Sequence, residues 1–185
     1  MLSVNPDDFW ARCTARNRDA DNRNKYQALL RGTRCATVAA SYRHRNHPAM
    51  HETPTIPSTM HAVIVPTPGG PEALQIVERP VPRPRHGEVL IKVAAAGVNG
   101  ADLSQRRGRY PMPPGASDVL GLEVSGTIAA VSDGVRGWRM GDAVCALLVD
   151  GGYAEYCTAP APQCLPVPAG ASLVEAAGLP EVVFT

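Results

Sequence analysis

From Met60 onward, the chain consists of short apolar segments that glycine and proline interrupt every few residues. Within these segments apolar and polar residues tend to alternate, which is typical of β-strands with one buried face. The pattern predicts strands over 61–65, 73–78, 88–95, 122–131, 143–148 and 153–158. Many short strands with dense turn signals favour a β-barrel or sandwich over a helical fold. The sequence therefore predicts a mainly β protein.

Two places break the strand pattern. Residues 99–107 have helical composition and are followed by Gly108, a residue that commonly ends helices. Ser172 and Glu175 form a capping box that starts a second helix, and Pro180 suits the first turn of a third. We expect short helices at these places and strands elsewhere.

The segment before Met60 has a different composition, rich in Arg, Asn, Asp and His with few apolar runs. This composition predicts disorder over 1–59. Its arginines and alanines resemble an organelle transit peptide, but Asp7, Asp8 and Asp19 argue against one because such peptides are poor in acids.

Net charge and cysteine usage restrict partners and compartment. The formal net charge of +1 favours neither nucleic acid nor a membrane surface as a partner. No apolar stretch approaches the roughly 20 residues that a membrane span needs. The five cysteines include no CxxC pair, which predicts reduced thiols in strands or core, and a cytoplasmic location.

Six motifs follow one another in order between Met60 and the last residue. They are Gly97-Val98-Asn99-Gly100-Ala101-Asp102-Leu103, Arg107-Gly108-x-Tyr110-Pro111, Pro113-Pro114-Gly115-Ala116-Ser117-x-x-Leu120-Gly121-Leu122-Glu123-Val124-Ser125-Gly126, Trp138-x-x-Gly141-Asp142-x-Val144, Gly151-Gly152-Tyr153-Ala154-Glu155-Tyr156 and Pro180-Glu181-Val182-Val183-Phe184-Thr185. Their order and spacing resemble the zeta-crystallin-like quinone oxidoreductases of the medium-chain dehydrogenase/reductase superfamily, most closely the p53-inducible type. Nothing before Met60 takes part in the resemblance.

The resemblance implies a fold and a domain plan. Residues 60–171 would form a GroES-like, partly open β-barrel, the catalytic N-terminal domain of the family. Residues 172–185 would begin the helical link to a Rossmann domain, which is missing from these 185 residues. No glycine-rich turn that could hold a cofactor pyrophosphate lies between a strand and a helix here.

The resemblance also implies chemistry without zinc. The related alcohol dehydrogenases carry a zinc-ligand cysteine where Asn99 stands, and Gly-His-Glu where Gly121-Leu122-Glu123 stands. An amide and a leucine cannot replace a thiolate and an imidazole as zinc ligands. We therefore expect no catalytic metal.

Three site residues come from the resemblance. Asn99 would lie by the nicotinamide and the substrate, Tyr110 would hydrogen-bond a quinone oxygen, and Thr185 would reach the nicotinamide amide. Each of the first two has a structural alternative, since Asn99 is also a good helix N-cap and Tyr110 could simply pack in its proline-rich loop.

Two acidic residues are expected to be mainly structural. Asp102 would support the helix start through the helix dipole. Glu123 lies in an apolar strand, where a carboxylate needs a partner. An ion pair with Arg106 or Arg107 is the expected partner, and a place in the substrate pocket is the alternative.

The implied activity is NADPH-dependent, zinc-independent hydride transfer to a quinone or an α,β-unsaturated carbonyl, with a small-molecule substrate and a homodimeric full-length form. The 185 residues alone would be inactive. One alternative is an enoyl or alkenal reductase of the same superfamily. Another is a truncated, non-enzymatic interaction module.

Overall fold

The computed structural model describes residues 55–184. The described residues belong to the unit that begins at Thr55. Thr185 and most of the extension predicted at 1–59 lie outside the described range.

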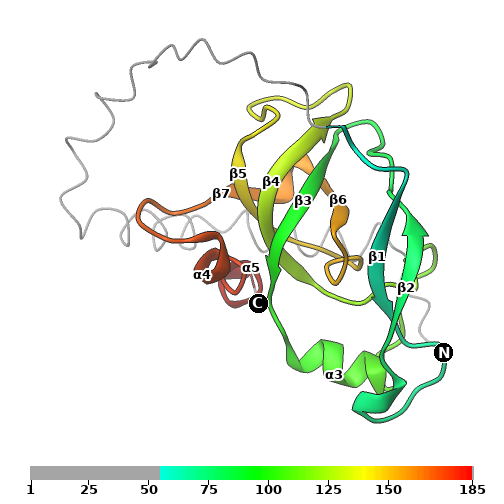
Figure 1. Cartoon of the computed structure of the whole chain (residues 1–185). Helices are drawn as coiled ribbons and strands as arrows, with labels where there is room; N and C mark the ends of the chain where they lie inside the picture. The colour runs from blue at the N-terminus through cyan, green and yellow to red at the C-terminus, as the bar shows by residue number, and fades with distance from the viewer. Residues whose placement is uncertain (1–54, 185) are drawn as a thin grey trace. The chain divides into compact units, whose positions relative to one another are not determined.

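Within residues 55–184, seven strands form two antiparallel sheets. Figure 1 shows how these strands are arranged. The smaller sheet pairs β1 (Thr59–Ile64) with β2 (Gln75–Pro80). The larger sheet has the order β6-β3-β4-β5-β7. Its strands are β3 (Glu88–Ala96), β4 (Glu123–Val131), β5 (Ala143–Leu147), β6 (Tyr156–Pro160) and β7 (Cys164–Pro166). The predicted mainly β architecture with short helices is confirmed.

The larger sheet is buried on both faces at β3. Val89 and Ile91 belong to one core cluster, whereas Leu90 between them belongs to another cluster that includes residues of β1. Successive side chains of a strand point to opposite faces, so β3 separates two cores. Register shifts between β3 and β4 bend this pair, and isolated bridges join β1 to Val119 and Ala154. The result is a curled sheet, partly closed by β1.

The predicted helix after β3 is α3 (Gly100–Arg106). Gly108 follows the C-cap residue Arg107, and its φ of 70° places it in the left-handed region that favours glycine. The amide of Gly108 donates to the carbonyl of Gln105, and the amide of Arg109 donates to that of Ser104, both at 2.8 Å. This pair of bonds is a Schellman motif, so the glycine ends the helix as its sequence position predicts.

The two C-terminal helices are α4 (Leu173–Ala176) and α5 (Leu179–Phe184), which lie next to each other in Figure 1. The predicted capping box at Ser172 and Glu175 is present, with reciprocal bonds of 2.8 and 3.2 Å. The hydroxyl of Ser125 donates to the carbonyl of Leu173, which ties α4 to β4. These contacts hold α4 and α5 against the sheet.

Several strand ends differ from the predicted ones; the first strand, for example, spans Thr59–Ile64 instead of 61–65. Three further differences concern the second strand, the last predicted strand and an unpredicted strand. The second strand begins at Gln75 instead of residue 73, because Pro71–Ala73 forms a 3₁₀ turn closed by the bond from Leu74 N to Pro71 O. The last predicted strand is β6, which begins at Tyr156 instead of residue 153. The three-residue β7 was not predicted, since so short a segment carries no alternation.

Across residues 55–184, no helix combines the length and the apolar character that crossing a membrane requires.

Candidate functional site

Asn99 lies at the N-cap of α3, directly after the loop that follows β3. The backbone of Asn99 is extended, and its backbone nitrogen donates a hydrogen bond to Oδ2 of Asp102 at 2.7 Å. Asn99 therefore occupies the predicted N-cap position, although its side chain forms no capping hydrogen bond, and Asp102 contacts the helix start through the bond to the Asn99 backbone. The cap position leaves the Asn99 side chain available for contacts beyond its own helix.

That side chain is directed at Glu123, which is only 2% exposed in β4. Nδ2 of Asn99 donates to Oε1 of Glu123 at 2.9 Å. A carboxylate can only accept, so the amide nitrogen must face it, and the orientation of the Asn99 amide is thereby determined. The sequence analysis placed Asn99 at the site, gave a place in the pocket for Glu123 only as the alternative to an ion pair, and did not predict this bond.

The second oxygen of Glu123 also has a partner. Oε2 accepts a hydrogen bond from the backbone nitrogen of Glu181 in α5 at 2.9 Å. The predicted ion pair of Glu123 with Arg106 or Arg107 is wrong, because both carboxylate oxygens bond to nitrogen atoms of Asn99 and Glu181. One buried carboxylate thus joins β4, the start of α3 and the start of α5.

Gly97 makes room for this carboxylate. A Cβ atom placed on Gly97 would lie 2.6 Å from Cδ and 2.7 Å from Cγ of Glu123, well inside contact distance. Its backbone is not in the left-handed region, so the requirement for glycine is one of space. The sequence shows this glycine only as part of a motif, and its function in packing emerges from the fold.

Asp102 connects the helix start to the loop before β6. Its Oδ2 accepts from the hydroxyl of Tyr153 at 2.9 Å, and that hydroxyl also lies 3.2 Å from the carbonyl oxygen of Gly97. Burial first, and then the hydrogen bond to Asp102, raises the pKa of Tyr153. Tyr153 therefore stays protonated and acts as a donor in this network.

Three carboxyl groups consequently lie close together beneath Asn99. Burial, followed by the charges of Glu123 and Asp102, raises the pKa of Glu181. Oδ1 of Asp102 is buried and accepts no hydrogen bond. The carboxylates of Glu123 and Asp102 thus accept hydrogen bonds that fix their donors in place, above all the side-chain amide of Asn99.

Comparison with known proteins supports the relationship predicted from the motifs. Residues 85–169 match the alcohol dehydrogenase GroES-like domain. The match lies within 60–171, the range predicted for such a domain. The curled, partly closed sheet agrees with it, so the predicted GroES-like fold is confirmed.

The curated relatives of this GroES-like domain include quinone oxidoreductases. The chain is 41% identical to rat quinone oxidoreductase over 113 residues, which covers 57% of the chain and 34% of the relative. It is 36% identical to the human synaptic vesicle membrane protein VAT-1 homolog-like over 121 residues, covering 65% of the chain and 29% of the relative. The predicted resemblance to the quinone oxidoreductases of the medium-chain superfamily is confirmed.

Solved structures give the same result. The crystal structure of the human VAT-1 homolog-like protein matches with a TM-score of 0.61 and 35% identity, covering 64% of this chain and 38% of that one. A mycobacterial protein solved in complex with NADPH matches with a TM-score of 0.56 and 41% identity, covering 65% of this chain and 36% of that one. The chain thus spans about a third of the length of the proteins that it matches.

The structure does not bring all the predicted site residues of the GroES-like domain into contact with one another. Tyr110 lies in the loop after α3, is 40% exposed, and forms no hydrogen bond with any residue in 55–184. Thr185 is outside the described residues. Asn99 and Glu123 are therefore the pair that the fold brings together, while the roles of Tyr110 and Thr185 stay predictions.

The described residues of the GroES-like domain show no cluster of three or more His, Cys, Asp or Glu side chains arranged to hold a metal ion. Cys145, Cys157 and Cys164 are buried, as predicted for core and strand residues. Burial raises the pKa of all three thiols, that of Cys164 to about 12. These thiols belong to the core and lie outside the Asn99 network.

Proposed function

We propose that this chain holds the substrate-binding domain of a zinc-independent, NADPH-dependent oxidoreductase that reduces a quinone or an α,β-unsaturated carbonyl. The observation that carries the proposal is the amide of Asn99, which the buried carboxylate of Glu123 holds in one orientation. The sequence identity of 41–43% with quinone oxidoreductases supports hydride transfer to a carbonyl compound as the class of reaction.

The Asn99 amide suits the stabilisation of a carbonyl oxygen. Nδ2 carries two hydrogens, of which one is directed at Glu123 Oε1, and the second can donate to a ligand. When a hydride is added to a quinone or an enone, negative charge builds up on the carbonyl oxygen. A donor already fixed in place stabilises that charge without having to reorganise.

Tyr110 would supply a second donor. Its hydroxyl forms no hydrogen bond within residues 55–184 and is partly exposed, so it is available to a substrate oxygen. We assign it a hydrogen-bonding role in the proposed function, and the proton that completes the reduction would come from solvent.

The cofactor would be held mainly elsewhere. Bound NADPH would supply the hydride. All strand pairs in residues 55–184 are antiparallel, so these residues contain no parallel βαβ unit of the kind that holds a pyrophosphate. The donor of Asn99 fits a nicotinamide carboxamide, as does the predicted contact of Thr185. We therefore propose that the 185 residues alone oxidise NADPH negligibly.

Zinc independence rests on the ligand types. Asn99 and Leu122 stand where the zinc-dependent relatives would have Cys and His, and the Asn99 amide is already bonded to Glu123. The proposal further includes a cytoplasmic location, small-molecule substrates without nucleic acid or membrane partners, and a homodimer of the longer form.

The first experiment measures the intact mass of the native protein. A mass larger than 19.6 kDa by a further domain would call for an assay of NADPH oxidation with a benzoquinone and, separately, with an enone. The faster acceptor would decide between a quinone reductase and an enone reductase. A mass of 19.6 kDa, with no turnover, would favour the interaction module instead.

Asn99→Ser is the matched variant for that assay. Serine is as good an N-cap as asparagine but has no amide to orient on Glu123. We expect kcat to fall by about 10²-fold, the usual effect of losing one such donor, while the fold persists. Unchanged kcat, or activity abolished by a zinc chelator, would contradict the proposal.

A further inference from the structure

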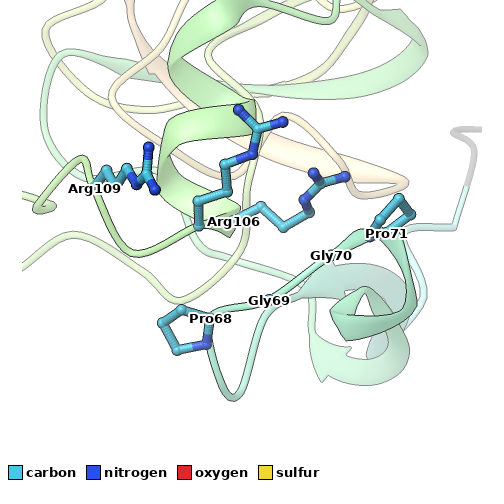
Figure 2. Close-up of a pocket in the computed structure, with 7 residues that line it drawn as sticks. Pro68, Gly69, Gly70, Pro71, Arg106 and Arg109 are labelled. Carbon is cyan, nitrogen blue, oxygen red and sulfur yellow. The ribbon is translucent and has the colours of Figure 1, made fainter.

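A second polar site lies at the opposite end of α3 from Asn99. It is a hollow of 480 Å³. Its lining residues are Pro68, Gly69, Gly70, Pro71, Arg106, Arg107 and Arg109. Figure 2 shows the arginine side chains beside the Pro68–Pro71 loop. The site thus combines three guanidinium groups with exposed loop backbone.

The Schellman motif at the end of α3 and the Pro68–Pro71 loop are in direct contact, which fixes the backbone around the hollow. Gly69 N donates to the carbonyl of Arg106 at 2.9 Å, which ties the loop to the helix end. A Cβ atom on Gly108 would lie 2.9 Å from Cγ of Pro68, so the turn after α3 packs directly on the loop. The backbone that carries the arginines is therefore fixed relative to the loop.

Arg106 is the unusual member of the set. It is 9% exposed, and its Nε is buried without a hydrogen-bond partner. Within residues 55–184, neither Arg106 nor Arg107 nor Arg109 forms a side-chain hydrogen bond or an ion pair. A buried donor without a hydrogen-bond partner is costly, which suggests that a ligand completes the site.

The helix dipole alone does not explain this arrangement. Cations at a helix C-terminus are favourable, and exposed arginines would be sufficient for that effect. The dipole gives no reason for Arg106 to be buried with an unsatisfied Nε beside two further cations that repel it. An anion shared among the three guanidinium groups removes both difficulties.

We propose that this hollow binds a phosphate group, either as free phosphate or as a phosphate monoester. Guanidinium groups donate in pairs to phosphate oxygens, and such charge-assisted bonds are stronger than neutral ones. Three cations match a dianion better than a single carboxylate, and the volume leaves room for an organic part of an ester. The site is separate from the Asn99 site and does not depend on the proposed oxidoreductase function.

Glu72 bears on the strength of binding. Glu72 does not itself line the hollow, but its carboxylate accepts at 3.0 Å from the backbone nitrogen of Gly70, which does, and it forms no ion pair with the three arginines. Its negative charge opposes an incoming anion. Glu72→Gln keeps an acceptor for Gly70 N and removes that charge, so binding should tighten several-fold.

The test is an NMR titration of the ¹⁵N-labelled 185-residue chain with inorganic phosphate and, separately, glycerol 3-phosphate at constant ionic strength. We expect saturable shifts of arginine Nε–H signals, with a Kd on the order of 1 mM or tighter for at least one of the two. The better ligand identifies the source of the phosphate group. Chloride at equal ionic strength should give no saturation.

Variants distinguish a site from general attraction. Arg107→Gln with Arg109→Gln, both exposed, should weaken binding by about tenfold or more, which is about 1.4 kcal/mol. Arg136→Gln with Arg139→Gln makes the same charge change at exposed positions elsewhere and should leave Kd unchanged. No saturation with either phosphate compound, or equal weakening in both double variants, would overturn the proposal.

Discussion

The side-chain amide of Asn99 donates a hydrogen bond to the buried carboxylate of Glu123 across 2.9 Å. The same carboxylate accepts from the backbone of Glu181. Segments that are 24 and 58 residues away in sequence thus meet at one side chain. This junction makes the orientation of Asn99 a property of the whole domain rather than of α3.

Replacing Glu123 by Gln should destabilise the protein by about 1–3 kcal/mol, because an amide presents its NH₂ group to one of two donors and leaves that donor unsatisfied. Urea denaturation of the full chain measures the change. The control is Glu78→Gln in β2, an exposed position where the change should stay within about 0.5 kcal/mol. Equal changes in the free energy of unfolding for Glu123→Gln and Glu78→Gln would mean that the hydrogen bonds of Glu123 contribute nothing to stability.

Gly97→Ala should cost about 1–3 kcal/mol, since the new methyl group would overlap the Glu123 side chain. In the Glu123→Ala background the same change should cost much less, because the overlapping atoms are gone. A double-mutant cycle by urea denaturation measures this coupling. Gly100→Ala, where an added Cβ meets no atom within 4 Å, is the control and should be nearly neutral.

Glu181 should make stability depend on pH. Because burial and the neighbouring carboxylates raise its pKa in the folded state, its favourable contribution is present below the unfolded pKa and is lost as pH rises through the folded value. Glu181→Gln should therefore gain stability relative to the natural chain between about pH 4 and pH 7. Denaturation curves over that range measure the difference.

Glu175 provides a control of opposite sign. Hydrogen bonds from the backbone and then the side chain of Ser172 lower the pKa of Glu175, so its contribution is present above the unfolded pKa and is lost as pH falls. Glu175→Gln should lose stability relative to the natural chain as pH rises. The same direction for both variants would contradict the assigned causes.

Cys145, Cys157 and Cys164 should resist alkylation in the folded protein. Their thiols are buried and burial raises their pKa, so little reactive thiolate forms at about pH 8. Labelling with iodoacetamide followed by peptide mass mapping should find these three modified only when denaturant is added. Rapid labelling of any of them without denaturant would place that thiol outside the core.

The strands and helix ends were predictable because their signals are local. The apolar run after the His86-Gly87 turn identified β3, and Ser172 with Glu175 identified the start of α4. Gly108 marked the end of α3, because the left-handed conformation that a Schellman motif requires favours glycine. The motif order from Gly97 onward was sufficient to indicate the family.

The partners of the buried polar groups were not predictable. The sequence indicated that a carboxylate at Glu123 needs a partner, and the nearby arginines were the reasonable choice. The fold instead directs Arg106 toward the Pro68–Pro71 loop and brings Asn99 and Glu181 to Glu123. Alternation and turn residues act over a few positions, so the sequence by itself determined the elements and the family. Which side chains meet depends on how the curled sheet closes, so only the tertiary structure decided the Asn99 network and the arginine-lined hollow.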